Sequence, residues 1–265
     1  MSTSPEGIYD IGIVDPGIPV ENPTQSYWLS EPGEISKLRS PWTDVADMVI
    51  IGSGITAVSL CSTLLLHQPD LRIVVVESRD LCSGATGRNG GHCKAMSPGV
   101  WFERKESLGI REAIRVMEFE HSHVDEIKAT VEKYQVECDL NLLEGLDVYH
   151  DMPTLSRAIC ALEDMQKNTP SLAAKYTLYT DRAELSSRNL SEHVVGAIGM
   201  AAASLWPYKL VISLFERLIA KHKLLVQTNT TVTAVIDDDR ETTLLCKLTE
   251  EPSERAMYCM PQTPG

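Results

Sequence analysis

The stretch from Met48 to Glu77 limits the possible folds of this chain more than any other segment. It begins with the apolar run MVII, continues through GSGITA and a mostly apolar stretch, and ends with IVVV before the glutamate. An apolar run that stops at a glycine is typical of a strand buried in a parallel sheet. We predict a strand over Met48–Ile51, a helix over Ile55–Leu66 and a strand over Arg72–Val76. A crossover helix between two such strands implies parallel pairing, so the three form one βαβ unit.

The turn inside this unit fits the pattern G-x-G-x-x-A. Gly52 permits the tight turn, Gly54 lets a backbone approach a pyrophosphate, and Ala57 keeps the helix close to the sheet. The positive end of the following helix stabilises phosphate charge. Glu77 follows Gly52 at close to the spacing of roughly 20 residues at which a carboxylate binds ribose hydroxyls, which also argues against a 2′-phosphate. The alternative is a plain tight turn with a solvated Glu77. Four features agree in favouring a dinucleotide site: the glycine pattern, the strand before it, the helix after it and Glu77.

This turn does not distinguish NAD from FAD, because both carry the same ADP moiety. The next segment does. Residues 83–91, SGATGRNGG, form a second loop of small residues along which a ribityl chain could run, and a surface turn would need fewer glycines. We therefore predict FAD as the cofactor. An NAD-dependent enzyme that uses only the first βαβ unit is the less favoured alternative.

Four motifs in chain order resemble those of FAD-dependent oxidoreductases of the D-amino-acid oxidase superfamily: NPTQSYWLSEP, ADMVIIGSGITA, VVVESRDLCSGATGRNGGH and SLWPYKLV. The resemblance is greatest to the branch around gamma-glutamylputrescine oxidoreductase and its fungal relatives, and it covers roughly Asn22 to Asp237. It implies an α/β fold with a Rossmann-like FAD-binding domain, a parallel central sheet and a partial mixed α+β substrate domain. It also implies oxidation of an amine or amino acid by hydride transfer to flavin, with oxygen as the acceptor.

The resemblance assigns roles in ADP binding to residues of the first unit. Around Ser53, it places four residues of the glycine turn on the pyrophosphate: Gly52, Gly54, Ile55 and Thr56. Glu77 would bind the adenosine ribose, with Ser78 and Arg79 beside the adenine. Val232, in TNTTVTAVI, matches the residue whose backbone holds the adenine.

The second small-residue loop would follow the rest of the cofactor. By the same resemblance, the pyrophosphate and ribityl chain would be lined by Ser83, Ala85 and Thr86. The isoalloxazine would be passed by Arg88, Asn89, Gly90, Gly91 and His92.

No catalytic residue is predicted, because in such enzymes the flavin carries the hydride chemistry and the protein orients the substrate. Arg88 could place positive charge near the flavin or serve as a structural partner of a carbonyl. For His92 and Cys93 we favour noncovalent packing over a covalent flavin link. Tyr208 and Lys209 could face the flavin, or be a core tyrosine and a solvated lysine.

The pattern along the chain predicts four parts. They are an extended N-terminal lead over 1–46, a discontinuous FAD-binding domain over 47–100 and 205–240, a partial helical substrate domain over 101–204 and an irregular tail over 241–265. Within the substrate domain, charged residues alternate with apolar ones at spacings of three and four from Glu103 to Tyr134. This pattern predicts one long amphipathic helix.

Charge and composition exclude several classes of function. The chain has 265 residues, 43% of them apolar, and its 37 acidic and 24 basic residues give a formal charge of −13. This charge would repel a phosphate backbone, so we predict no nucleic-acid partner. We expect a small amine or amino acid as the substrate.

Metal, disulfide and membrane features are also not predicted. The seven cysteines form no C-x-x-C pair and are odd in number, which argues against a zinc cluster or a complete disulfide framework and favours a reducing compartment. His121 and His123 are interpreted as helix-surface residues and not as metal ligands. The N-terminus lacks a secretory pattern, and the longest nearly apolar stretch, Val194–Trp206, is too short to span a bilayer. We therefore expect a cytoplasmic protein.

The family pattern continues past the strand predicted at Thr243–Leu248, with further strands and a closing glycine-rich flavin contact that this sequence lacks. We therefore expect a C-terminally truncated chain with an exposed sheet edge. Two classes of function follow. The chain is an active oxidoreductase whose missing half is supplied by a partner or an oligomer, or it is a noncatalytic flavin-binding or degenerate protein.

Overall fold

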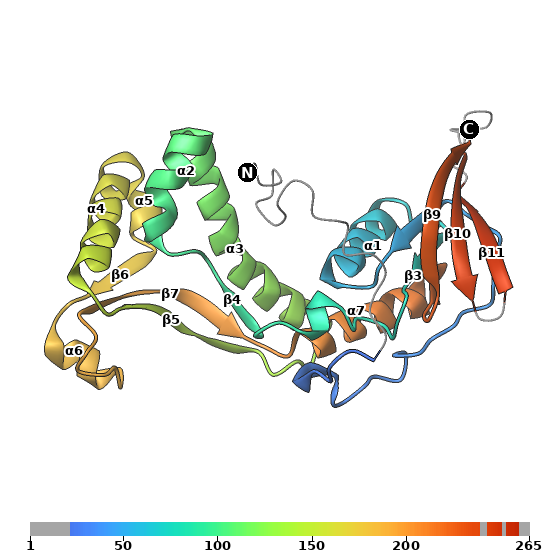
Figure 1. The fold of residues 1–265 in the computed structure, drawn as a ribbon, viewed down its shortest axis with the longest axis horizontal. Coiled ribbons are helices and arrows are strands. Elements are labelled where there is room, and N and C mark those ends of the chain that lie inside the picture. The colour runs from blue at the N-terminus through green and yellow to red at the C-terminus, as the bar shows by residue number, and fades with distance from the viewer. Residues whose placement is uncertain (1–21, 239–242, 251–252, 260–265) are drawn as a thin grey trace. The chain divides into compact units, whose positions relative to one another are not determined.

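The computed structural model describes residues 22–238, 243–250 and 253–259. Two compact units make up the chain (Figure 1). The first unit joins the part up to Arg88 with the part from Val211, and the second comprises Asn89–Leu210. Helix α7 (Pro207–Lys221) contains the second of these limits. Both units mix helices and strands, and the parallel sheet of the first agrees with the predicted α/β class.

The first unit contains the predicted βαβ arrangement. Its sheet has the order β2-β3-β8, with every pairing parallel: β2 (Met48–Ile51), β3 (Ile73–Val76) and β8 (Leu224–Gln227). Helix α1 (Ile55–His67) connects β2 to β3, and all four residues of β3 are buried. The β-branched run of β3 is suited to this position, because branched side chains pack well on a pleated surface.

A buried carboxylate aligns the starts of β2 and β3. Asp47 accepts hydrogen bonds from the backbone N–H of Arg72 at 2.8 Å and from its Nη2 at 2.6 Å. The side chain of Asp47 is 1% exposed. A buried charge is tolerated when it is paired and hydrogen-bonded, and here the pairing also fixes the register of the two strands.

The first unit has a second sheet, of order β1-β11-β10-β9. Its strands are β1 (Val45–Ala46), β9 (Thr231–Asp238), β10 (Thr243–Glu250) and β11 (Ser253–Cys259). Ala46, Leu248 and Met257 of this sheet pack with residues of β3 in one buried cluster. The strand predicted at Thr243–Leu248 forms as β10, but the expectation of an irregular tail is wrong for β11. The backbone of β11 is satisfied by antiparallel pairing with β10 and parallel pairing with the distant β1.

The second unit is built on an antiparallel sheet around β7 (Gly196–Ser204). The strand β5 (Asn141–Tyr149) pairs along its whole length. On the other edge of β7 lie β4 (His92–Lys94) and β6 (Tyr176–Tyr179). The sequence indicated β7 only as an apolar stretch. Its glycine and alanine residues lack both the β-branched density and the polar alternation by which a strand is predicted.

Helices accompany this sheet (Figure 1): α2 (Trp101–Leu108), α3 (Ile110–Tyr134), α4 (Met152–Asn168), α5 (Pro170–Ala173) and α6 (Arg182–Ser187). The prediction of a single helix over Glu103–Tyr134 is wrong, because the helix is interrupted at Gly109. This residue has φ +78°, a conformation that glycine adopts without steric cost and that ends α2. The apolar spacing continues on both sides of the glycine and therefore did not reveal the break.

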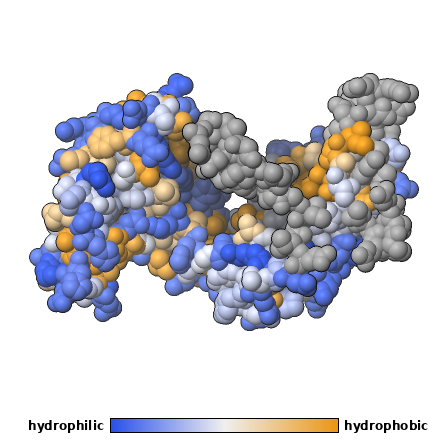
Figure 2. Space-filling view, viewed as in Figure 1, coloured by the Kyte–Doolittle hydropathy of each residue, from blue (hydrophilic) through white to orange (hydrophobic). Residues whose placement is uncertain are grey.

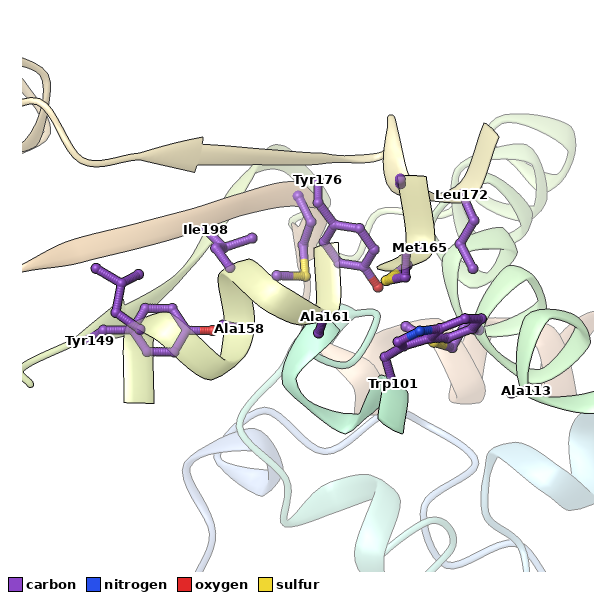
Figure 3. Packing of buried hydrophobic residues seen from close by; sticks show 13 residues of the cluster. Trp101, Ala113, Tyr149, Ala158, Ala161, Met165, Leu172, Tyr176 and Ile198 are labelled. Carbon is purple, nitrogen blue, oxygen red and sulfur yellow. The ribbon is translucent and has the colours of Figure 1, made fainter. Parts of the chain in front are cut away.

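The main core of the second unit lies where these helices meet the sheet (Figure 3). Trp101 and Met165 from the helices pack there with Tyr176 and Ile198 from the strands. The polar ends of the aromatic side chains are satisfied. The Trp101 Nε1–H donates to Asp164 at 2.7 Å, and the Tyr176 hydroxyl donates to the Met96 carbonyl at 2.9 Å. Large aromatic residues therefore fill this core without leaving unpaired groups.

The imidazole of His121 on α3 also lies inside this unit. The residue is 6% exposed, so its interpretation as a surface residue is wrong. Its ring meets the Tyr176 ring edge to face at a centroid distance of 4.9 Å. Its Nε2 is buried and has no hydrogen-bond partner among the described residues. Burial lowers the pKa of His121, the charge of Lys175 lowers it further, and Glu120 opposes both.

We predict that His121 makes the stability of the chain depend on pH. Its pKa is lower in the folded chain, so the unfolded chain takes up the proton first as the pH falls below the usual histidine value of about 6.5. The contribution of neutral His121 to the free energy of unfolding is therefore fully present above that pH. Below it, the free energy of unfolding falls by at most about 1.4 kcal/mol per pH unit. In urea unfolding between pH 7 and 5, His121→Leu should flatten this slope. The exposed His123→Leu should leave the slope unchanged, and an equally steep slope in His121→Leu would contradict the assignment.

Candidate nucleotide-binding site

The glycine turn lies directly after β2. The Gly52 N–H donates to the Val76 carbonyl at 2.7 Å, which keeps the turn attached to β3. Gly52 has φ +92°, and a Cβ placed on it would meet no atom within 4 Å. Its requirement for glycine is therefore conformational. At Gly54 the requirement is one of space, because a Cβ there would lie 3.0 Å from Thr86 Oγ1.

The N-terminus of helix α1 has a partial positive charge that no side chain of the helix itself neutralises. Gly54 is the N-cap and supplies no side-chain hydrogen bond, and the first turn contains no acidic residue. The Ile55 N–H donates to Thr86 Oγ1 at 2.9 Å. The first amides of a helix carry partial positive charge and bind anions readily. The positive end of α1 could therefore stabilise a phosphate at the turn.

Glu77 is the buried carboxylate of this region. Its Oε2 accepts hydrogen bonds from the Ser53 N–H at 3.1 Å and from the Ser53 hydroxyl at 2.7 Å. Its Oε1 accepts the Arg79 N–H at 3.0 Å, with the Ser78 hydroxyl at 3.4 Å. A carboxylate has about four lone-pair sites, so the three short bonds leave capacity for a ribose hydroxyl. Glu77 thus joins the glycine turn to the loop after β3.

Ser53 extends the same network, because its hydroxyl also accepts the Cys82 N–H at 2.7 Å. Burial, followed by the charge of Glu77, raises the pKa of the Cys82 thiol to about 12. The thiol therefore stays protonated and adds no second negative charge beside the carboxylate. The segment before β9 closes the network from the other side, with the Thr230 N–H donating to the Glu77 carbonyl at 2.9 Å and the Asn229 N–H to the Arg79 carbonyl at 3.0 Å.

Two buried polar atoms beside this network have no hydrogen-bond partner in the part of the chain that the structure describes. They are the hydroxyl of Ser83 and Nε of Arg79. Buried donors and acceptors are nearly always satisfied, so a partner such as a ligand is expected at an orphaned pair. Together with the open space above Gly52, they fit an ADP-bearing cofactor.

The second small-residue loop is divided between the two units. Ala85–Gly87 forms a short 3-10 helix in the first unit. Arg88 donates through Nε to the Ser83 carbonyl at 3.1 Å and through Nη2 to the Thr24 carbonyl at 2.5 Å. The guanidinium of Arg88 thus donates to backbone carbonyls. This is the structural role that the sequence analysis gave as the alternative to a charge beside the flavin.

Asn89, Gly90, Gly91 and His92 belong to the second unit. Asn89 Oδ1 accepts the Gly91 N–H at 2.7 Å, and the Gly91 carbonyl accepts the Leu205 N–H at 2.9 Å. These bonds tie the loop to the end of β7. His92 is exposed at the start of β4, opposite Ser204.

Tyr208 and Lys209, which the sequence suggested could face the flavin, have protein contacts instead. Tyr208 is 2% exposed, and Lys209 Nζ lies 3.5 Å from an Asp139 carboxylate oxygen and 3.9 Å from the Trp206 ring centroid. These contacts favour the core tyrosine and make Lys209 a paired cation. Burial raises the pKa of Cys93, which disfavours the thiolate that a covalent tether would need.

Val232 lies on β9 opposite Leu248 and packs at the margin of the cluster around β3. Sequence reasoning missed one residue of the site region, Gly87. A Cβ at this position would lie 2.6 Å from the Cys82 carbonyl and 2.9 Å from Leu29. The available signal was its place in a glycine-rich run, where close backbone approach is a common reason for glycine.

The described residues contain neither a candidate metal site nor a helix that could span a membrane. No group of three or more histidine, cysteine, aspartate or glutamate side chains among them is arranged to hold a metal ion. In the same part of the chain, no helix has the length and apolar character needed to cross a membrane.

Solved structures with similar folds include three enzymes. L-amino acid deaminase from Proteus vulgaris is 14% identical with a TM-score of 0.62, covering 82% of this chain and 47% of that one. Glycine oxidase from Geobacillus kaustophilus is 15% identical with a TM-score of 0.59, covering 81% and 54%. L-proline dehydrogenase from P. horikoshii is 16% identical with a TM-score of 0.57, covering 78% and 50%. At these identities the likeness shows the fold, and the chain spans about half the length of these structures.

The sequence supplies the family. Comparison with curated proteins finds no match. The model of the DAO family, described as FAD dependent oxidoreductase, matches residues 47–258, a range that begins just before the glycine turn and ends in β11. That range includes β2, α1, β3 and Glu77, which form the candidate nucleotide site. The chain therefore belongs to the DAO family of FAD-dependent oxidoreductases.

Proposed function

We propose that this chain binds FAD through its first unit and takes part in oxidising an amine or amino acid by hydride transfer to the flavin, with oxygen as the acceptor. The observation that carries the proposal is the junction of the glycine turn with Glu77. There the start of α1, a buried carboxylate and two orphaned polar atoms lie around one turn. Amino-acid deaminases and oxidases among the similar folds support the substrate class.

In this proposal the cofactor-binding residues of the first unit have distinct physical roles. The turn Gly52–Ile55, with Thr56, surrounds the pyrophosphate, whose charge the positive end of α1 stabilises. The Ser53 and Ile55 N–H groups keep their partners in Glu77 and Thr86 and hold the turn in shape. Glu77 accepts a hydroxyl of the adenosine ribose, and Ser53 holds the carboxylate in place through two hydrogen bonds. Ser83 gains a partner for its buried hydroxyl. These groups are positioned before the cofactor arrives, which lowers the ordering cost of binding.

The second unit is proposed to hold the substrate side of the reaction. By the family resemblance, Asn89–His92 would pass the isoalloxazine, and Val232 would hold the adenine by its backbone. Within the family, the four ordered motifs from NPTQSYWLSEP to SLWPYKLV support a place in the branch around gamma-glutamylputrescine oxidoreductase and its fungal relatives. The substrate class proposed for this branch is an amine or an amino acid.

A partner or second copy is proposed to complete the protein. In the described part of the chain, β2 pairs only with β3, so its other edge is available to a further strand. Apolar patches interrupt the hydrophilic surface (Figure 2). Surfaces of this kind favour contact with another polypeptide.

A noncatalytic flavin-binding or degenerate protein is the second candidate, because the contacts at the glycine turn and Glu77 account for cofactor binding and not for turnover. Membership of an FAD-dependent family favours FAD over NAD.

Purification and turnover separate the candidates. We expect yellow protein with bound flavin, and hydrogen peroxide release with at least one member of a panel of primary and secondary amines and amino acids. Yellow protein that is silent with the whole panel would favour the noncatalytic candidate. Protein that stays colourless after addition of FAD would refute FAD binding, and with it the active oxidoreductase, and would leave only a degenerate protein.

Gly54→Val should weaken FAD binding by about tenfold or more, since each tenfold corresponds to about 1.4 kcal/mol. The added Cβ would meet Thr86 Oγ1 at 3.0 Å, and its methyl groups would occupy the space of the phosphates. Gly54→Ala adds only the Cβ and should be intermediate. A flavin titration followed by fluorescence measures the effect.

Gly99→Ala provides the matched control, because its Cβ would meet only Ser97 Oγ, at the ordinary contact distance of 3.5 Å. Equal flavin content in Gly54→Val and the wild-type chain would show that the pyrophosphate lies elsewhere.

A further inference from the structure

The N-terminal lead is bonded along the edge of the parallel sheet. The Ser40 N–H donates to the Val226 carbonyl of β8 at 2.8 Å, and the Val226 N–H donates to Ser40 Oγ at 3.0 Å. The Leu38 carbonyl accepts the Thr228 N–H at 3.2 Å, and the Ser36 carbonyl accepts the Leu81 N–H at 2.8 Å. This part of the lead therefore has a fixed path over the first unit.

Further toward the N-terminus, the lead contacts the loop Ser83–Arg88 itself. Ser26 caps the short 3-10 helix Tyr27–Leu29 by accepting the Trp28 N–H at 3.3 Å. Leu29 at the end of this helix lies against Gly87, so closely that a Cβ on the glycine would come within 2.9 Å of the leucine side chain. The close approach depends on the absence of a side chain at Gly87.

Arg88 fastens the two segments to each other. Its Nη1 donates to Thr24 Oγ1 at 3.1 Å and its Nη2 to the Thr24 carbonyl at 2.5 Å, while its Nε donates to the Ser83 carbonyl at 3.1 Å. Three donors of one planar guanidinium are thus used on neutral oxygens of the chain. Only the fork of an arginine can reach all three, because lysine presents a single ammonium.

The other side of the same loop reaches the phosphate site. Thr86, two residues before Arg88, accepts the Ile55 N–H at 2.9 Å at the start of α1. Its Oγ1 lies 3.0 Å from the position of a Cβ on Gly54. The place of Thr86 is fixed by the loop, and the loop is fastened from outside through Gly87 and Arg88. A continuous set of contacts therefore connects the lead to the turn.

We propose that Thr24–Leu29 and Arg88 form a strap that positions the loop Ser83–Arg88 for cofactor binding, and that Arg88 is a positioning residue and not a contact of the flavin. The inference rests on the proposed function, since the loop is positioned for FAD. The strap orders the loop in advance, so that binding does not have to order it.

The test compares FAD dissociation constants of full-length variants by flavin fluorescence. We expect Arg88→Met to raise Kd about tenfold and Arg88→Lys to raise it nearly as much. Thr24→Val loses the hydroxyl acceptor and should raise Kd by about threefold, whereas Thr24→Ser keeps both acceptors and should retain the wild-type value. In the double variant Thr24→Val/Arg88→Met the Kd should equal that of Arg88→Met alone. Both substitutions break the same contact, the one between Thr24 and Arg88, so the second change has nothing further to remove.

The free energy of unfolding without FAD is measured for each variant, so that a loss of folding is separated from a loss of affinity. A wild-type Kd in Arg88→Lys beside a raised Kd in Arg88→Met would overturn the strap and make Arg88 a charge contact of the cofactor. Independent, additive effects of the Thr24 and Arg88 changes would also overturn it. If the wild-type chain binds no FAD at all, the proposed function fails and the inference fails with it.

Discussion

The hydrogen bonds of the Glu77 carboxylate are the interaction on which the candidate nucleotide site depends. Through this one side chain, the turn after β2 is joined to the loop after β3. The backbone of the same residue donates to the Gln227 carbonyl of β8 and accepts the Thr230 N–H before β9. A buried carboxylate is costly unless it is fully hydrogen-bonded. The cost is offset here by amide and hydroxyl donors that also hold the site in shape.

The surrounding elements follow from this arrangement. A parallel strand buried on both faces requires cover, which α1 and the second sheet of the first unit supply. The lead occupies the β8 edge, and Thr86 brings the loop after β3 to the helix start. The second unit has a core of its own, centred on Trp101 and Tyr176. The DAO family match covers elements of both units.

Local patterns predicted the elements that contain their own signal. The strands β2 and β3, helix α1 and the residues of the glycine turn are all encoded within one short stretch, and they form as predicted. Contacts between distant segments could not be predicted in this way. Arg88 and Thr24 are 64 positions apart, β11 finds its partners in β10 and β1, and the break at Gly109 is hidden by continuing apolar spacing. The burial of His121 likewise depends on Tyr176 from another element. The binding roles assigned by resemblance stay predictions.

The most direct test of the central claim is ADP binding, measured by calorimetry on the wild-type chain and on Glu77→Gln. The substitution keeps the size of the side chain but removes the charge that strengthens its hydrogen bonds, which are worth about 1.5–3 kcal/mol each. We predict that the wild-type chain binds ADP, that Glu77→Gln weakens binding by about tenfold or more, and that Asp70→Asn, at a carboxylate that is 93% exposed, has no effect. Equal affinity in the folded Glu77→Gln variant and the wild-type chain would contradict the account.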